Sequence, residues 1–164
     1  MFAAFERELK RYVEGVHRLY PGASDQALRR AEVELGHELP RAYRTFLKRW
    51  NGGLLFAKEF FDVHLWPIND QLRGYVREYD SDLVRENRVF LSPQERPSGT
   101  LVIGSYSDGS LICLALRPPH RVQVWLRDEH ETEEEWESLE AWLDDEMRAG
   151  AEMYDIHGNE RRSD

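Results

Sequence analysis

With 164 residues, 41% of them hydrophobic and five of them tryptophan, the chain has enough apolar surface to fold as one domain, which excludes wholesale disorder. No apolar run approaches the roughly 18 residues of a membrane span, and the charged N-terminus argues against a signal peptide, so we expect a cytoplasmic protein without a membrane partner. The single cysteine, Cys113, excludes an internal disulfide framework and a multi-cysteine zinc site.

The net charge of −9 comes from one block of the sequence. Eleven of the 31 acidic residues lie between Asp128 and Glu146, and this block contains no Lys or Arg. The rest of the chain carries slightly more basic than acidic residues. Such a block repels the phosphate backbone of nucleic acids and attracts basic proteins, so we expect no direct binding of nucleic acid.

Three helices are predicted before the first strand. Residues 2–20 place apolar side chains at helical spacing and are followed by Pro-Gly, which stops a helix. Residues 24–36 form the second helix, with Ser24 as its N-cap and a glycine at its end. Residues 40–50 form the third, which residues 51–53 (Asn-Gly-Gly) are expected to close because they tolerate positive φ.

The middle of the chain is predicted to contain two short strands, a helix and a loop. Residues 54–56 and 60–66 are the strands, the second alternating apolar with polar side chains. Residues 68–83 return to the helical period, with Asn69 as a cap. Residues 92–99 have the composition of a loop.

The clearest β signal follows this loop. Residues 101–106 and 111–116 flank Asp108-Gly109, a pair that favours a tight hairpin turn. The second of these strands is apolar on both faces, which is typical of a central strand covered on both sides. Residues 121–127 are predicted to form the third strand of an antiparallel meander.

The last element is predicted to be a helix that begins within the acidic block. Its apolar stripe comprises Trp136, Leu139, Leu143, Met147, Ala151 and Tyr154. Residues 157–164 are a polar tail expected to fray, so that the domain spans residues 1–156. The element order predicts a single α+β domain, with N-terminal helices and a C-terminal helix packed on a mainly antiparallel sheet.

Two stretches and a short link resemble one known family. Residues 38–56, ELPRAYRTFLKRWNGGLLF, place Leu-Pro before a helix and Asn-Gly-Gly after it. Residues 101–125, LVIGSYSDGSLICLALRPPHRVQVW, combine Ile-Gly, an Asp-Gly turn, an apolar strand and a strand that ends in Val-Trp. With Leu-Trp-Pro-Ile at 65–68 between them, these motifs resemble, in order, those of the SUKH superfamily across roughly residues 28–125.

The resemblance implies a protein-binding domain rather than an enzyme. The superfamily includes fungal cell-wall-assembly regulators and many bacterial immunity proteins, which occupy a toxin domain, often a nuclease or a nucleic-acid deaminase. A protein of this kind would bind a toxin domain with a basic surface, and the alternative is a regulatory or scaffold domain with another protein partner. The shared motifs are structural, so the resemblance assigns no catalytic residue to this chain.

The residues themselves show no pattern of a catalytic or metal site, and we expect no cofactor. His130-Glu131 lacks the second histidine of a zincin helix, and the six histidines have no repeated ligand spacing. Cys113 lies in an apolar strand, which is typical of a packed core cysteine rather than a nucleophile. His64 alternates out of an apolar strand and is expected at an exposed position of the sheet.

Two interpretations of the acidic block remain open. It is either a solvated linker and helix start, whose acids interact with the helix dipole, or a face that imitates the charge of a nucleic acid and meets a basic toxin site. Trp136 belongs to the predicted core stripe, whereas Trp142 is a candidate aromatic anchor. The candidate partner-binding residues are Asp128, Glu129, Glu131, Glu133, Glu134, Glu135, Glu137, Trp142, Asp144 and Asp145. We expect a monomer or a weak dimer.

Overall fold

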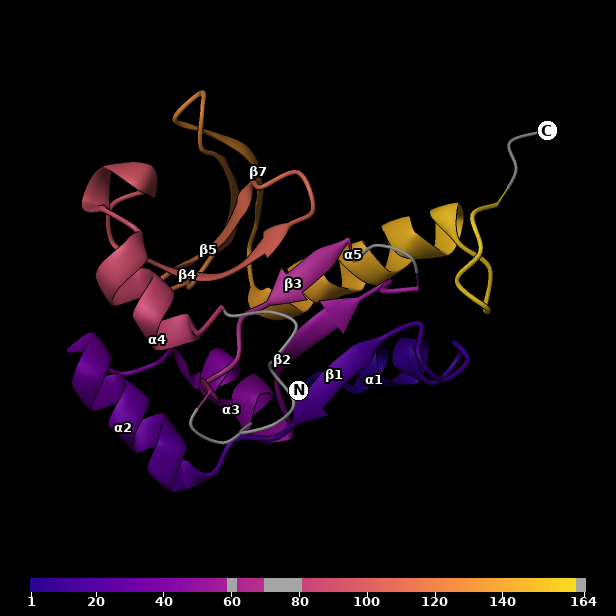
Figure 1. Cartoon of the computed structure of the whole chain (residues 1–164), viewed down its shortest axis with the longest axis horizontal. Coiled ribbons are helices and arrows are strands. Elements are labelled where there is room, and N and C mark those ends of the chain that lie inside the picture. The colour runs from indigo at the N-terminus through magenta and orange to yellow at the C-terminus, as the bar shows by residue number, and fades with distance from the viewer. Residues whose placement is uncertain (59–61, 70–80, 162–164) are drawn as a thin grey trace.

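A computed structural model describes residues 1–58, 62–69 and 81–161. These residues form an α+β fold around one antiparallel sheet in which neighbours in sequence are neighbours in space (Figure 1). The strands are β1 Arg18–Pro21, β2 Trp50–Leu55, β3 Val63–Leu65, β4 Thr100–Tyr106, β5 Leu111–Ala115, β6 Val122–Leu126 and β7 Glu131–Trp136. The helices are α1 Ala3–Leu9, α2 Asp25–Leu35, α3 Arg41–Arg49, α4 Leu83–Arg85 and α5 Leu139–Met153, with a π-helix at Glu86–Phe90 and a 3₁₀ turn at Pro93–Glu95. The predicted fold class is confirmed.

The first predicted helix is shorter than expected. It ends at Leu9, and Gly15 with φ of 93° interrupts the apolar periodicity on which the prediction rested. A left-handed residue cannot continue a right-handed helix. The chain then enters the edge strand β1, where Arg18 pairs with Leu54 of β2. The apolar residues of this segment therefore serve a strand as well as a helix.

The second and third predicted helices are confirmed. The Ser24 hydroxyl oxygen accepts a hydrogen bond from the Ala27 amide at 3.1 Å, and Gly36 ends α2 with φ of 80°. Residues 51–53, however, lie inside β2 instead of closing α3. Gly53 is needed there because a Cβ atom would stand 2.3 Å from the Arg18 carbonyl oxygen of the neighbouring strand. Asn51, beside it, bonds with its side chain to both the N–H (2.9 Å) and the carbonyl (3.0 Å) of Ile68.

The middle of the chain is only partly described. Val63–Leu65 confirms the described part of the strand predicted at 60–66, and most of the helix predicted at 68–83 lies outside the described residues. Asp82 is the N-cap of the next helix, α4: its carboxylate accepts hydrogen bonds from the amides of Arg85 and Asn69, both at 2.8 Å. The helix that follows, continued by the π-helix to Phe90, was not predicted.

The β4–β5 hairpin is confirmed. The Gly109 amide donates to the Tyr106 carbonyl at 3.0 Å, and the Asp108 carboxylate accepts from the Ser110 amide at 2.9 Å, which closes the turn. As expected, β5 is covered on both faces, since Leu111 to Leu114 are each at most 2% exposed. Strand β6 then continues the meander at Val122–Leu126.

The acidic block is the largest difference from the prediction. Residues expected as a linker and helix start form β7, which pairs with β6 and ends the sheet. The chain reverses through residues 127–130, where His130 has φ of 55°. Helix α5 begins only at Leu139, with the Ser138 hydroxyl oxygen accepting from the Ala141 amide at 3.1 Å. The interpretation that places Glu133, Glu134 and Glu135 at the start of this helix is therefore wrong, because they lie in β7.

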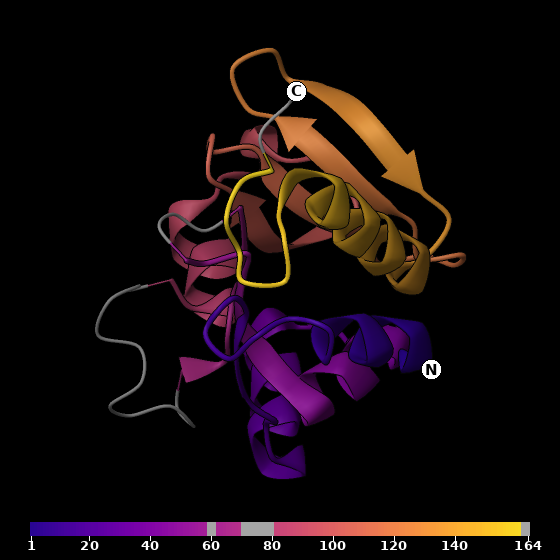
Figure 2. The same ribbon diagram turned by 90° about the vertical axis from the view of Figure 1, so that its right-hand side faces the viewer.

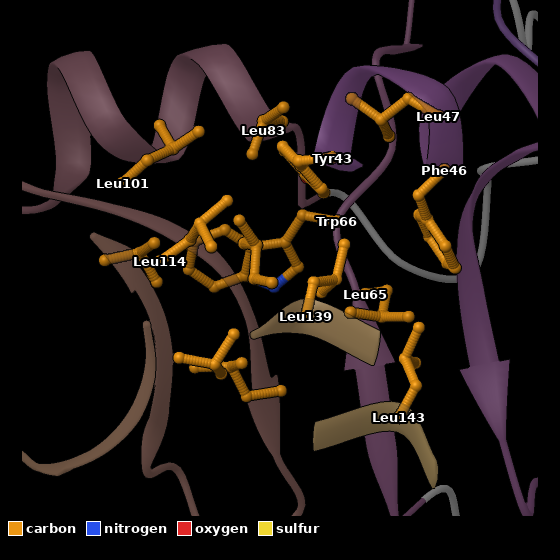
Figure 3. Packing of buried hydrophobic residues seen from close by; sticks show 14 of the residues in the cluster. Tyr43, Phe46, Leu47, Leu65, Trp66, Leu83, Leu101, Leu114, Leu139 and Leu143 are labelled. Carbon is orange, nitrogen blue, oxygen red and sulfur yellow. The ribbon is translucent and has the colours of Figure 1, made fainter. Parts of the chain in front are cut away.

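One buried cluster joins the helices to the sheet (Figure 3). In this view, side chains from α3, α4, α5 and strands β3 to β5 gather around Trp66. Figure 2 shows the β6–β7 hairpin, in orange, at one end of the molecule with α5 packed beside it. Residues 131–135 of this hairpin are all exposed and lie outside the core.

The end of the chain folds back onto α5 as far as Arg161, instead of fraying from residue 157. The Arg161 amide donates to the Met153 carbonyl at 2.7 Å, and the Asp155 amide donates to the Asn159 carbonyl at 2.9 Å. Residues 162–164 lie outside the described part of the chain.

Candidate protein-binding surface

The exposed acids gather on a β-hairpin. We call β6, the turn at 127–130 and β7 the acidic hairpin. Its exposed acids, together with Glu137 directly after it, are Asp128, Glu129, Glu131, Glu133, Glu134, Glu135 and Glu137. Trp136 fixes the end of β7 to α5, because its indole N–H donates to the Asp145 carboxylate at 3.1 Å. The hairpin is thus tied to α5 at its base, while Arg127 in its turn pairs with Glu95 at 2.6 Å.

Most of these acids lack a basic neighbour. Arg121 pairs with Glu135 at 2.5 Å and with Glu137 at 3.0 Å. Hydrogen bonds from Gln123 and Arg121 hold the pKa of Glu135 below its ordinary value. Within the described ranges, no ion pair joins a base to the other five: Asp128, Glu129, Glu131, Glu133 and Glu134. The hairpin therefore presents negative charge that nothing nearby in the described chain neutralises.

A β-bulge aims two of the acids at a groove. Val124 pairs with Glu134 and Trp125 with Thr132, so Glu133 is an extra residue in β7. Glu133 and Glu134 both line a groove of about 340 Å³ between the acidic hairpin and α5. Asp62, Asp108 and Glu146, from three other parts of the chain, line it as well. We call this the acidic groove.

The floor of the acidic groove is a network of hydrogen bonds that ties α5 to the sheet. The Tyr106 hydroxyl donates to Glu146, and the Trp142 indole N–H contacts both the Tyr106 oxygen (3.0 Å) and a Glu146 carboxylate oxygen (3.1 Å). Burial raises the pKa of Glu146. Beside them the Tyr154 hydroxyl donates to Asp62 at 3.1 Å, and burial raises the pKa of Asp62. A cation entering the groove would meet carboxylates that are held in place.

The family of the chain follows from a comparison with family models. The model of the SMI1 / KNR4 family (SUKH-1) matches residues 22–145. The chain belongs to this family. The match extends from the segment before α2 into α5, so it includes the acidic hairpin. No curated protein matches the chain.

The predicted partner-binding residues of this SUKH domain fall into three groups. The seven acids from Asp128 to Glu137 are exposed and share the hairpin end of the molecule. Asp144 is exposed on α5, whereas Asp145 is half-buried and pairs with Arg148 at 2.9 Å. Trp142 is fully buried, and its placement as a surface anchor is corrected: its indole closes the floor of the acidic groove from inside the core.

Sequence reasoning missed the contributions of distant segments to the acidic groove. Asp108 was recognised only as a turn residue, and nothing in the sequence placed Asp62 and Tyr106 beside the last helix. The carboxylate and hydroxyl groups involved lie 38 to 84 residues from Glu146, and only the sheet brings them together. Alternation in β4 carried a weak signal, since it directs Tyr106 to the face that α5 covers.

Of the two potentially reactive side chains, His64 and Cys113, only His64 differs from its expected exposure. His64 is 4% exposed, which corrects its predicted exposed position, and burial lowers its pKa to about 4. Cys113 is buried in β5 as predicted, and burial raises the pKa of its thiol to about 12. Its thiolate, the reactive form, is thereby disfavoured.

Neither a metal cluster nor a membrane-spanning helix is present in the part of the chain that the structure describes. There, no group of three or more His, Cys, Asp or Glu side chains is placed to hold a metal ion. Among the same residues, no helix is both long and apolar enough to cross a membrane.

Proposed function

We propose that this SUKH domain neutralises a bacterial toxin domain by binding it stoichiometrically, without turnover. The observation that supports the proposal most strongly is the acidic hairpin, with five exposed acids that have no basic partner among the described residues. A nuclease or a nucleic-acid deaminase needs a basic surface to hold a polyanion. The acidic hairpin carries negative charge, as a nucleic acid does, and could therefore occupy such a basic surface in its place.

Charge of this kind acts mainly on the rate of association. Opposite surface charges steer two proteins together and raise the association rate above that of neutral pairs, an effect that salt screens. Because the acids lie on a projecting hairpin outside the core, they are free to meet a concave site. Direct occlusion of a toxin's substrate site would follow from such docking.

A purely structural role explains fewer of the acids. β7 is the last strand of the sheet, and charged side chains on an edge strand discourage edge-to-edge aggregation. This role accounts for acids within the strand, such as Glu131 and Glu134. It does not account for Asp128 and Glu129, which lie in the turn and not along the unpaired edge of β7. A binding role accounts for both groups.

A growth-rescue experiment tests the proposal. The probe is the C-terminal domain of the protein encoded beside the gene for this chain, tested for toxicity in a bacterium that also produces variants of the chain. Replacing Glu131, Glu133 and Glu134 with Lys should abolish protection. Replacing Glu14, Glu34 and Glu38, which are exposed on the N-terminal part, with Lys alters net charge equally and should leave protection intact.

Two outcomes would contradict the proposal. If the chain gives no protection against a toxic neighbouring domain, the immunity function is wrong. If the hairpin variant protects as well as the control variant, the acidic hairpin is not the binding surface, although a stoichiometric inhibitor acting through another face would remain.

The second candidate function is a regulatory or scaffold domain that binds a housekeeping protein. Membership of the SMI1 / KNR4 family (SUKH-1) is compatible with it, because the SUKH superfamily includes fungal cell-wall-assembly regulators. A harmless neighbouring domain, or a gene with no secreted multidomain protein beside it, would favour this function over immunity.

A further inference from the structure

Two adjoining hollows border the turn of the acidic hairpin and the π-helix, and the first of them also shares Asp108 and Ser110 with the acidic groove. The first, of about 700 Å³, lies under the turn of the acidic hairpin, and the second, of about 580 Å³, lies beside the π-helix. Gly109 and Arg127 line both, which makes the hollows continuous. We call the whole the hairpin channel. Its two halves differ in chemistry.

The half beside the π-helix has an apolar floor and an exposed aromatic side chain, and its walls also carry polar groups such as Glu86 and Ser105. Leu91 and Leu111, 7% and 2% exposed, form its floor. Phe90 is 51% exposed at its rim, and the Arg85 guanidinium lies 5.0 Å from the centre of the Phe90 ring. The contact with Arg85 holds the Phe90 ring in a defined position, while about half of the Phe90 side chain stays exposed to solvent. Aromatic and arginine side chains are enriched among residues that dominate binding energies.

The half under the hairpin turn is acidic. Asp128 and Glu129 are exposed there, and neither has an ion-pair partner in the described part of the chain. Arg127, which separates the two halves, is already held by Glu95 at 2.6 Å. Asp108 adds a further carboxylate, fixed by the Ser110 hydroxyl at 2.6 Å. The channel therefore changes from a negative end to an end with an apolar floor and an exposed aromatic ring.

We propose that the hairpin channel binds an extended segment of the partner protein that carries Lys or Arg followed by a large apolar side chain. The basic side chain lies against Asp128 and Glu129, and the apolar side chain packs on Phe90 above Leu111. Charge complementarity selects this occupant, because the acidic half repels nucleic acid and acidic peptides. A segment with basic side chains alone would leave the apolar floor of the other half uncovered, so a large apolar side chain is needed as well. The identification of the partner as a toxin rests on the function proposed above. The chemistry of the bound segment is inferred from the lining of the channel alone.

A peptide selection tests the channel without the toxin. The probe is a phage-displayed library of random short peptides, selected on the immobilised full chain, and the strongest peptide is then synthesised for titration. We expect enriched peptides to combine Lys or Arg with a nearby aromatic or large aliphatic residue. Phe90→Ala should weaken binding of the synthetic peptide by about tenfold or more. Replacing Asp128 and Glu129 with Lys should weaken it similarly.

Val89→Ala is the matched control, because Val89 belongs to the same π-helix, is 70% exposed and does not line the channel. It should change the affinity less than about twofold. Enrichment of acidic peptides, no enrichment over a bare surface, or equal losses in Phe90→Ala and Val89→Ala would overturn the proposal. If the selection fails but the growth-rescue experiment succeeds, the channel proposal is wrong and the immunity function stands. If the peptide binds but the growth-rescue experiment fails, the channel binds such a segment and the partner is not a toxin.

Discussion

At the scale of single residues, Asn87 replaces a missing strand. Beyond Leu65, β3 no longer pairs with β4, which leaves the backbone of Val102 without a strand on that side. The Asn87 amide group donates to the Val102 carbonyl at 2.7 Å and accepts from the Val102 N–H at 2.9 Å. It also donates to the Leu83 carbonyl at 2.8 Å, and Arg96 contacts its oxygen at 2.5 Å. One buried side chain thus completes the sheet and joins it to α4.

Replacing Asn87 with Leu should therefore lower the free energy of unfolding by about 3 kcal/mol, because two buried backbone groups lose their partners. Urea denaturation followed by tryptophan fluorescence measures the change. The control is Asn159→Leu at an exposed position, for which we expect a change below about 1 kcal/mol. Equal effects of the two substitutions would show that the Asn87 hydrogen bonds do not stabilise the fold.

His17 gives the fold a defined pH dependence. Its Nδ1 accepts a hydrogen bond from the Phe56 amide at 3.2 Å, and its ring lies 4.6 Å from the Phe56 ring and 4.8 Å from that of Tyr12. Burial lowers its pKa from 6.5 to about 4. Since the unfolded chain takes up a proton at higher pH than the folded chain, the contribution of His17 to stability is complete above about pH 6.5 and decreases as the pH falls toward 4.

His17→Asn should weaken this dependence, because the asparagine side-chain oxygen can accept the Phe56 hydrogen bond but does not titrate. Urea denaturation at about pH 7, 5.5 and 4.5 should show a smaller loss of stability in the variant than in the wild type. His64, whose pKa is also lowered to about 4, keeps a dependence of the same sign in the variant. Parallel pH profiles of variant and wild type would contradict the assignment to His17.

At the scale of elements, the packing of α5 depends on a helical glycine. Gly150 faces the Phe56 ring so closely that a Cβ atom would stand 1.9 Å from its Cζ. The ring cannot easily retreat, since it stacks on Tyr154 at 5.3 Å and contacts Tyr12 and His17 on other sides. This contact sets how near α5 approaches the exit of β2.

Gly150→Ala should consequently destabilise the fold by about 2 kcal/mol, although the same change in an exposed helix stabilises by up to about 1 kcal/mol. Thermal unfolding measures both sign and size. In a Phe56→Leu background the cost should shrink, because the smaller side chain leaves room for the added methyl group. A stabilising effect of Gly150→Ala in the wild type would contradict the close packing.

The sequence predicts elements well where local chemistry determines them. Helix α2 carries its own caps, helix α3 carries an apolar stripe behind Pro40, and the β4–β5 hairpin carries Asp-Gly between its strands. Strand β7 has neither signal: before Trp136 it contains only acids and one threonine. Its hydrogen bonds come from β6, so pairing across the hairpin overrides local propensity. β1 was hidden for a related reason, since its apolar residues also fit a helical period.

At the scale of the whole molecule, the charge is separated from the core. The core joins the helices to the inner strands, while the acidic hairpin extends the sheet beyond them (Figure 2). The acidic run itself was evident in the sequence, including every exposed hairpin acid. The acidic groove and the hairpin channel that it borders were not, because Asp62, Asp108 and Phe90 reach them only through the tertiary fold.

The central claim is that the acidic hairpin guides and forms the contact with a basic partner. The most direct measurement is the association rate of the purified neighbouring toxin domain at about 50 mM and about 500 mM salt, with wild type, the Lys variant at Glu131, Glu133 and Glu134, and the charge-matched control at Glu14, Glu34 and Glu38. We predict that high salt slows the wild type and the control by about tenfold or more, and that the hairpin variant associates slowly at both salt concentrations. An association rate in the hairpin variant equal to that of the control at low salt would contradict the account.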